Sequence, residues 1–98
     1  MSTITHVSHP RIQVFAPGAN TEETIVLEAV ARFKLKARGS TALRIAYQKG
    51  FVATGAAGTP FFTLAAGGLY EEDGLSAQSL TLYVAPAAGD YIELLTWN

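Results

Sequence analysis

The side chains that could carry out acid–base or metal chemistry are few in this chain of 98 residues. Both histidines, His6 and His9, fall within the first ten residues, and there is no cysteine. A metal centre built on these histidines would need further ligands, and the sequence offers neither a third histidine nor a thiolate. We therefore expect solvated histidines, no metal ion and no cofactor.

A short acidic run at 71–73, followed by Gly74, could suggest calcium. Calcium takes roughly six to eight oxygen ligands, and this run lacks the alternating ligand spacing of a calcium loop, so a charged turn is the better interpretation. The sequence has no G-x-S-x-G elbow for a nucleophilic serine, and its glycines lack the Lys-Ser or Lys-Thr pair of a phosphate loop. The glycines in question are Gly55, Gly58, Gly67 and Gly68. The chain is not expected to be an enzyme.

The layout of charge is more informative than its total of −1. Between positions 30 and 50 there are only cations, and every charge after Phe51 is acidic. The cations are Arg32, Lys34, Lys36, Arg38, Arg44 and Lys49. Such a basic face is either an ordinary solvated surface or a docking surface, for the 71–73 run of a neighbouring copy or for a larger partner. Nucleic acid is not expected as a partner, because base-stacking aromatics do not interleave with the cations.

Positions 24–38 show the clearest periodicity in the sequence. Their odd positions are apolar, and the charges of 32–38 all fall on even positions. A period of two predicts a β-strand with two different faces. A helix that begins at Thr21, with Glu22 and Glu23 in its first turn, is the alternative, since acids there suit the helix dipole. The odd–even sorting of charge favours the strand.

The strand at 24–38 is predicted to form a hairpin with 42–48, whose odd positions are again apolar, through the turn 39–41. A two-residue loop would place Lys36 against Leu43, whereas a three-residue loop keeps both faces consistent. The facing pairs are then Leu35 with Ile45, Phe33 with Tyr47, and Lys36 with Arg44. The cations would share the outer face of this hairpin.

Further short strands are predicted at 11–16, 61–65, 69–72, 79–85 and 91–97, with at most a short one at 51–53. The last two form a second predicted hairpin, in which Val84 faces Ile92 and Leu82 faces Leu94. Residues 1–10 end in Pro10 and lack a sustained period, so they are expected to be an extended N-terminal arm. The sequence thus predicts one all-β domain over 11–98, an antiparallel β-sandwich or jelly-roll-like barrel of six to eight short strands.

The last predicted hairpin is apolar on both faces. One face is aliphatic and suits a core, whereas the other carries four larger or aromatic residues that either close against another strand or form a subunit contact. The composition, with 49% hydrophobic and 15% charged residues, favours an oligomer or a docked subunit. The residues predicted for the interface are Arg32, Lys34, Lys36, Arg44, Tyr83, Tyr91, Leu95 and Trp97. Aromatic residues on a sheet could also stack sugars.

No stretch approaches the roughly 20 apolar residues of a membrane-spanning helix, and no secretory signal follows Met1. We therefore expect no membrane partner, and synthesis in the cytoplasm.

Several segments of the chain resemble small β-rich virion proteins of tailed bacteriophages, of the capsid decoration (cement) or fibre-associated kind. These segments are ALRIAYQ at 42–48, FFTLAAGGLYEEDGL at 61–75, SLTLYV at 79–84 and YIELLTW at 91–97. The resemblance implies a β-sandwich subunit on the capsid surface, which binds the major capsid protein or other virion subunits and stabilises the particle, often as a symmetric trimer. The N-terminal arm would suit a strap to neighbouring subunits. The alternative is a receptor- or carbohydrate-binding module of a phage fibre or spike.

Overall fold

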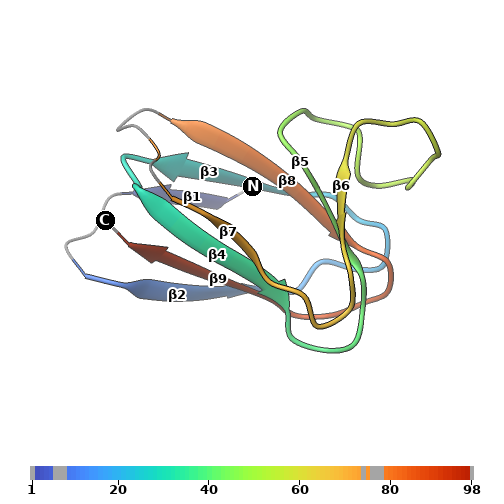
Figure 1. Cartoon of the computed structure of the whole chain (residues 1–98), viewed down its shortest axis with the longest axis horizontal. Coiled ribbons are helices and arrows are strands. Elements are labelled where there is room, and N and C mark those ends of the chain that lie inside the picture. Colours follow the sequence, from blue (N-terminus) through green and yellow to red (C-terminus); the bar gives the residue numbers. More distant parts are fainter. Residues whose placement is uncertain (1, 6–8, 74, 76–78, 98) are drawn as a thin grey trace.

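The computed structural model describes residues 2–5, 9–73, 75 and 79–97, and these residues form nine β-strands and no helix. The strands make two sheets that pack face to face, so the prediction of an all-β sandwich is confirmed (Figure 1). Nine strands are one more than the six to eight expected. Their bounds are β1 Ser2–Thr5, β2 Arg11–Phe15, β3 Glu23–Glu28, β4 Arg32–Ala37, β5 Leu43–Ala46, β6 Phe62–Leu64, β7 Tyr70–Glu72, β8 Leu80–Pro86 and β9 Ile92–Trp97.

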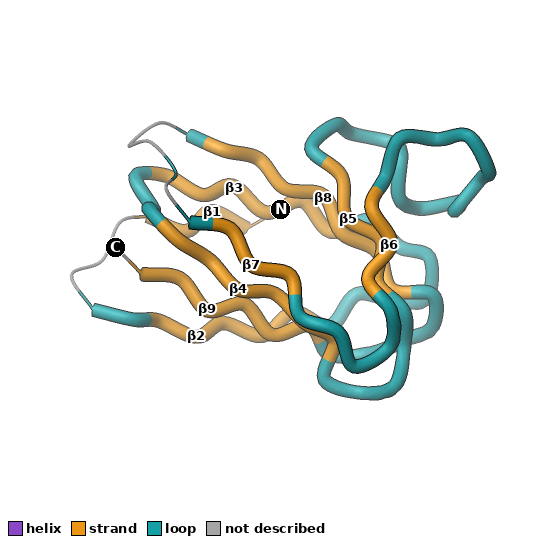
Figure 2. Tube along the Cα trace, in the orientation of Figure 1, coloured by secondary structure: helices purple, strands orange, loops and turns teal. Residues whose placement is uncertain are grey.

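The five-stranded sheet has the order β1-β3-β8-β5-β6, and the four-stranded sheet has the order β2-β9-β4-β7. All pairs are antiparallel except β1 with β3, which is parallel. Strands that follow each other in sequence alternate between the two sheets, and β5–β6 is the one consecutive pair that is hydrogen-bonded among the described strands. The chain therefore crosses the sandwich at almost every connection (Figure 2).

The segment predicted as one strand over 24–38 is two strands, one in each sheet, and this part of the prediction is wrong. Ala29 takes a left-handed backbone with φ of 57°, which interrupts the extended chain between β3 and β4. The prediction of the inward face is confirmed on both sides of the break. Ile25, Leu27, Phe33, Leu35 and Ala37 are all buried.

Both predicted hairpins are also wrong. β4 pairs with β9 and β7, whereas β5 pairs with β8 and β6, so 24–38 and 42–48 do not face each other within a sheet. Likewise β8 and β9 lie in opposite sheets. Their expected inward residues Leu82, Val84, Ile92 and Leu94 nevertheless meet in one core. Alternation fixes the face that a strand buries but not the strand beside it.

The core lies between the sheets and takes aliphatic side chains from both, together with the fully buried Phe33. A smaller cluster of Ala46, Val52 and Ala85 lies where the 47–61 loop folds back on β5 and β8, with Phe51, Phe61 and Tyr83 packed around it. No strand forms at 51–53, where a short one was allowed. Val52 is buried, and this burial, rather than strand pairing, holds that part of the loop against the domain.

The expectation of a separate arm does not hold for Ser2–Thr5. These residues form β1, which pairs with β3 from Ser2–Ile25 to Thr5–Glu28, and Ile4 is 1% exposed within the core. A short extended segment with one apolar residue becomes an edge strand because that residue finds space between the sheets. His9 is exposed, and His6 lies outside the described residues.

Candidate interaction surface

The outer face of the four-stranded sheet gathers apolar and charged side chains in cross-strand rows. The pairing places Ile12 beside Leu95, Leu95 beside Lys34, and Lys34 beside Glu71. The next row contains Val14, Glu93 and Lys36. We call this surface the mixed face. Its residues are Ile12, Val14, Arg32, Lys34, Lys36, Glu71, Glu93, Leu95 and Trp97.

Several apolar side chains on and beside the mixed face are exposed and take no part in the core. Ile12 is 70% exposed and Val14 is 44% exposed on β2, and Leu69, which borders the mixed face just before β7, is 52% exposed. A shallow hollow of about 250 Å³ lies between Ile12 and Leu69, and it is lined by Ile12, Lys34, Lys36, Leu69, Glu93, Leu94 and Leu95. Exposed apolar surface around a concavity, with charges at its rim, is typical of a contact site for another molecule.

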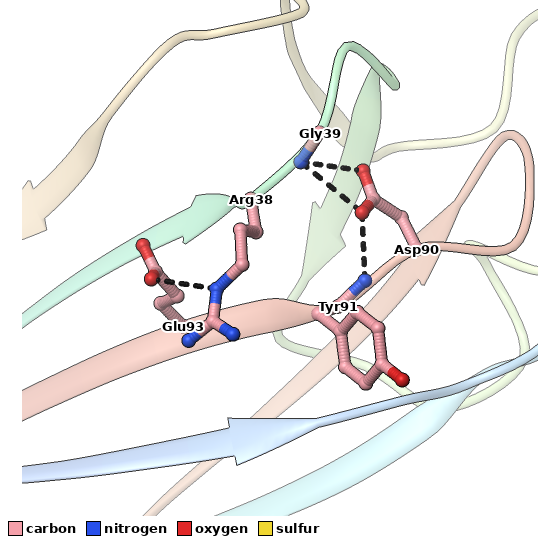
Figure 3. Close-up of polar contacts among 5 residues, drawn as sticks. All are labelled: Arg38, Gly39, Asp90, Tyr91 and Glu93. Carbon is pink, nitrogen blue, oxygen red and sulfur yellow. Dashed lines mark hydrogen bonds and ion pairs between the residues drawn. The ribbon is translucent and has the colours of Figure 1, made fainter.

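Two cations on this side of the sheet have acidic partners in the same chain. Lys34 Nζ lies 3.5 Å from Glu71 Oε2 and 5.7 Å from the centroid of the Trp97 ring. Arg38 Nε donates a hydrogen bond to Glu93 Oε2 at 2.9 Å, and its guanidinium lies 5.9 Å from the Tyr91 ring (Figure 3). Both pairs are partly exposed, so each adds little to stability. These two cations therefore do not need an acidic neighbouring molecule for charge balance.

Arg44 and Tyr83, two of the predicted interface residues, lie on the five-stranded sheet instead. The Arg44 guanidinium donates hydrogen bonds to the backbone oxygens of Val52 and Ala53 and to Asn20 Oδ1. A Cβ at Gly55 would lie 3.0 Å from this guanidinium. Arg44 thus holds the 47–61 loop against β5, and Tyr83 packs on the small cluster beneath that loop.

The other six predicted interface residues come together on one side of the molecule. Arg32, Lys34, Lys36, Leu95 and Trp97 lie on the mixed face, and the exposed Tyr91 lies just before β9 at its border. Ile12, Val14, Leu69 and Glu93 also belong to this surface or to its hollow, and sequence reasoning missed them as site residues. Ile12 and Val14 share one face of β2 because they are two positions apart, and the pairing of β2 with β9 places both on the mixed face.

A second group, the aromatic seam, links β6 of one sheet to β7 of the other and is exposed at Tyr47 and Phe62. It consists of Phe33, Tyr47, Phe62 and Tyr70. The Tyr70 ring lies 5.7 Å from the Phe62 ring and 5.9 Å from the Phe33 ring. The hydroxyls of Tyr47 and Tyr70 are 2.7 Å apart, and the Tyr70 hydroxyl donates to Glu72 Oε1 at 3.3 Å.

The environment of the seam raises the pKa of both tyrosines. For Tyr47 the pKa is raised by burial first and then by the hydrogen bond with Tyr70. For Tyr70 burial is again the largest cause, and the nearby Glu72 carboxylate adds to it. Both hydroxyls therefore stay protonated at neutral pH, where they can donate hydrogen bonds.

Within the described part of the chain, no group of three or more His, Cys, Asp or Glu side chains could hold a metal ion. The same residues include no helix long and apolar enough to cross a membrane.

No protein-family model and no curated protein matches the sequence. Solved structures do match over most of the chain. A de novo designed double-stranded β-helix is 18% identical, with a TM-score of 0.49, and the match covers 92% of this chain and 97% of that one. A structure from Bacillus endospore appendages, described as disulfide-linked pili, is 18% identical with a TM-score of 0.51, covering 94% and 87%. The Yersinia pseudotuberculosis-derived mitogen is 7% identical with a TM-score of 0.50, covering 93% and 86%. At such identities the likeness concerns the fold alone.

Proposed function

We propose that this chain is a structural subunit of a bacteriophage particle, a capsid decoration or cement protein that docks on the capsid surface through the mixed face. The observation that carries the proposal is the exposure of Ile12 and Leu69 at one hollow, with the exposed Val14 two residues from Ile12 on the same strand. Burying these side chains against a partner would be favourable by roughly 25 cal/mol for each Å² of apolar surface removed from water.

The contrast between the two outer faces supports this choice of surface. The outer positions of β1, β3 and β8 carry Thr3, Thr5, Thr24, Glu28 and Thr81, which are small or charged and suit contact with water, and the larger residues there, Val26 and Tyr83, are partly buried. The mixed face instead offers exposed aliphatic side chains with Trp97 and Tyr91 beside them. Large aromatic residues of this kind are the usual anchors of protein interfaces.

The pairing of charges on this side of the sheet also suits docking on a protein. Lys34 and Arg38 are already matched by Glu71 and Glu93, so a partner can cover the hollow without having to supply matching acids there. An apolar centre with a polar rim is the common anatomy of such contacts. The specific partner, a capsid lattice, is suggested by the resemblance of 42–98 to phage virion proteins.

Capsids incubated with the purified protein test the proposal. We expect the protein to bind and to raise the resistance of the capsid to heat and chaotropes. Ile12→Glu should abolish binding, because it places a charge in the apolar centre of the mixed face. Thr63→Glu is the matched control, since Thr63 is an exposed edge-strand residue of the other sheet. Absence of binding by the unaltered protein would remove the proposal.

A second candidate function, carbohydrate binding within a fibre or spike, is favoured by the aromatic seam. Phe62 is 57% exposed and Tyr47 is 45% exposed, and the Tyr70 hydroxyl and the Glu72 carboxylate lie beside them. Apolar ring faces with a few fixed polar groups can hold a sugar ring in place. Glycan-array binding that disappears in Phe62→Ala, while Ile12→Glu still binds, would favour this function over docking on a capsid.

A further inference from the structure

The four edge strands of the sandwich differ in how well they are protected from pairing with another chain. β6 and β7 have three residues each, and β7 carries two glutamates. β1 has four residues, three of which are Ser or Thr. β2 is the longest of the four with five residues, and the three between Arg11 and Phe15 include neither a charge nor a proline. Short length, charge and proline are the usual protections of a sheet edge, so β2 is the least protected.

One side of β2 is open in the structure. β2 pairs with β9 over all five residues, and no other described strand pairs with it. The strand forms the border of the four-stranded sheet (Figure 1). Its outward side chains, Ile12 and Val14, are among the exposed large hydrophobic residues of the protein. An apolar strand with a free backbone edge can accept a further strand.

Gln13, at the centre of β2, supplies an independent observation. It is opposite Leu94 and so points toward the inner side of the sheet. Its Oε1 is buried, and it has no hydrogen-bond partner among the described residues. A buried polar atom without a partner is unfavourable by about 1–3 kcal/mol. A group that pairs with Gln13 across the open edge would remove this penalty.

We propose that two copies of the chain associate through antiparallel pairing of their β2 strands about a two-fold axis at Gln13. In this register Gln13 lies opposite Gln13, Ile12 opposite Val14, and Arg11 opposite Phe15. It is the two-fold register that pairs all five residues of β2 while keeping the outward residues of both copies on the same face. The two four-stranded sheets then become one continuous sheet.

This pairing accounts both for the unpartnered Oε1 of Gln13 and for the exposed Ile12 and Val14. Directly opposite side chains in an antiparallel pair have Cβ atoms about 4.5–5.5 Å apart, so the two Gln13 amides can each donate one N–H to the other's oxygen. On the outer side, Ile12 of one copy packs beside Val14 of the other. Together with Leu95, these residues extend the apolar centre of the mixed face across the axis.

The absence of cysteine from the sequence makes single-cysteine variants a direct test. Opposite residues in antiparallel strands have Cα atoms about 4.5–5.5 Å apart, within the range that a disulfide spans. We expect Gln13→Cys to form a covalent dimer under mild oxidation. Ile12→Cys mixed with Val14→Cys should form a mixed dimer in preference to either dimer of like chains. Thr63→Cys, on an edge strand of the other sheet, is the control and should stay monomeric.

Sedimentation of the unaltered protein completes the test, and we expect a monomer–dimer equilibrium that depends on concentration. A monomer at every accessible concentration would overturn the proposal, as would the three-fold oligomer that the phage resemblance implies. A dimer whose Gln13→Cys and mixed Ile12→Cys and Val14→Cys forms do not cross-link would also overturn it. The measurements use no capsid, so the inference does not rest on the proposed function. A protein that dimerises but fails to bind capsids refutes only that function.

Discussion

The backbone N–H of Gly39 donates to both carboxylate oxygens of Asp90, at 3.1 and 3.0 Å, across 51 positions of sequence. The same carboxylate accepts a hydrogen bond of 2.7 Å from the N–H of Tyr91 (Figure 3). Gly39 follows β4 and Asp90 precedes β9, so one side chain joins the ends of two paired strands. A Cβ at position 39 would lie 2.8 Å from Asp90 Oδ2, which is why glycine suits this position.

Substitutions at these two positions should be coupled. Asp90→Ala is expected to lower the free energy of unfolding by about 1 kcal/mol, because it removes charge-assisted hydrogen bonds that are exposed to water. Gly39→Ala should be destabilising in the unaltered protein and less so in the Asp90→Ala background, where its clash partner is gone. Urea denaturation of the two single variants and the double variant measures the coupling. Strictly additive effects would contradict it.

Trp97→Ala should reduce docking more than it reduces stability. Trp97 is partly exposed on the mixed face beside Lys34, whereas Phe33 is fully buried. Phe33→Ala, the comparison variant, is expected to lower the free energy of unfolding by about 3–5 kcal/mol. Capsid binding and thermal unfolding, measured on both variants, separate the two effects. Unchanged binding by the Trp97 variant would show that this aromatic residue does not take part in the contact.

We expect Arg44 to stabilise the 47–61 loop and to take no part in the proposed docking. Arg44→Met removes the hydrogen bonds to Val52, Ala53 and Asn20, and a loss of about 1–3 kcal/mol is expected. Arg44→Lys should recover only part of it, because an ammonium group cannot reproduce the planar set of donors. Hydrogen exchange at the amides of 51–55 should accelerate in both variants. A variant that loses capsid binding while exchange stays slow would show that Arg44 contacts the partner.

Alkaline pH should destabilise the protein through the aromatic seam. The pKa values of Tyr47 and Tyr70 are raised above their ordinary value of 10.0 in the folded state. Below pH 10 both states hold the phenolic protons, and this contribution to stability is fully present. As the pH rises above 10, the unfolded state loses those protons first, so the free energy of unfolding falls. Denaturation at pH 8 and pH 11 measures the fall, which should be smaller in Tyr47→Phe.

The inward faces of the strands could be predicted from sequence because alternation is a local property. Ile25, Leu27, Phe33 and Leu35 were expected on one face, and all four are buried. The pairing partners could not be predicted in the same way. β4 pairs with β9 and β7 and not with β5, the next strand in sequence. The alternation within one strand does not specify which other strand lies beside it.

Two local features could not be predicted from the sequence, and each has a physical reason. Ala29 has a positive φ that alanine disfavours, so no glycine or proline marked the end of β3. Ser2–Thr5 has one large apolar residue, Ile4, too little for a strand to be predicted from periodicity. For the candidate surface, the cations and aromatic residues were visible in the sequence. The contribution of Ile12 and Val14 depends on β2 lying beside β9, which is a contact between the two ends of the domain.

The alternation of successive strands between sheets has a consequence for how the molecule forms. The mixed face requires β2, β9, β4 and β7, and no two of these follow each other in sequence. Such non-local pairing is slow, because long loops must close before the contacts that compensate for them exist. The mixed face is therefore not formed in a growing or partly unfolded chain. If the chain docks through this surface as proposed, only molecules that have completed folding could attach to the partner, and immature copies would be left out of the assembly.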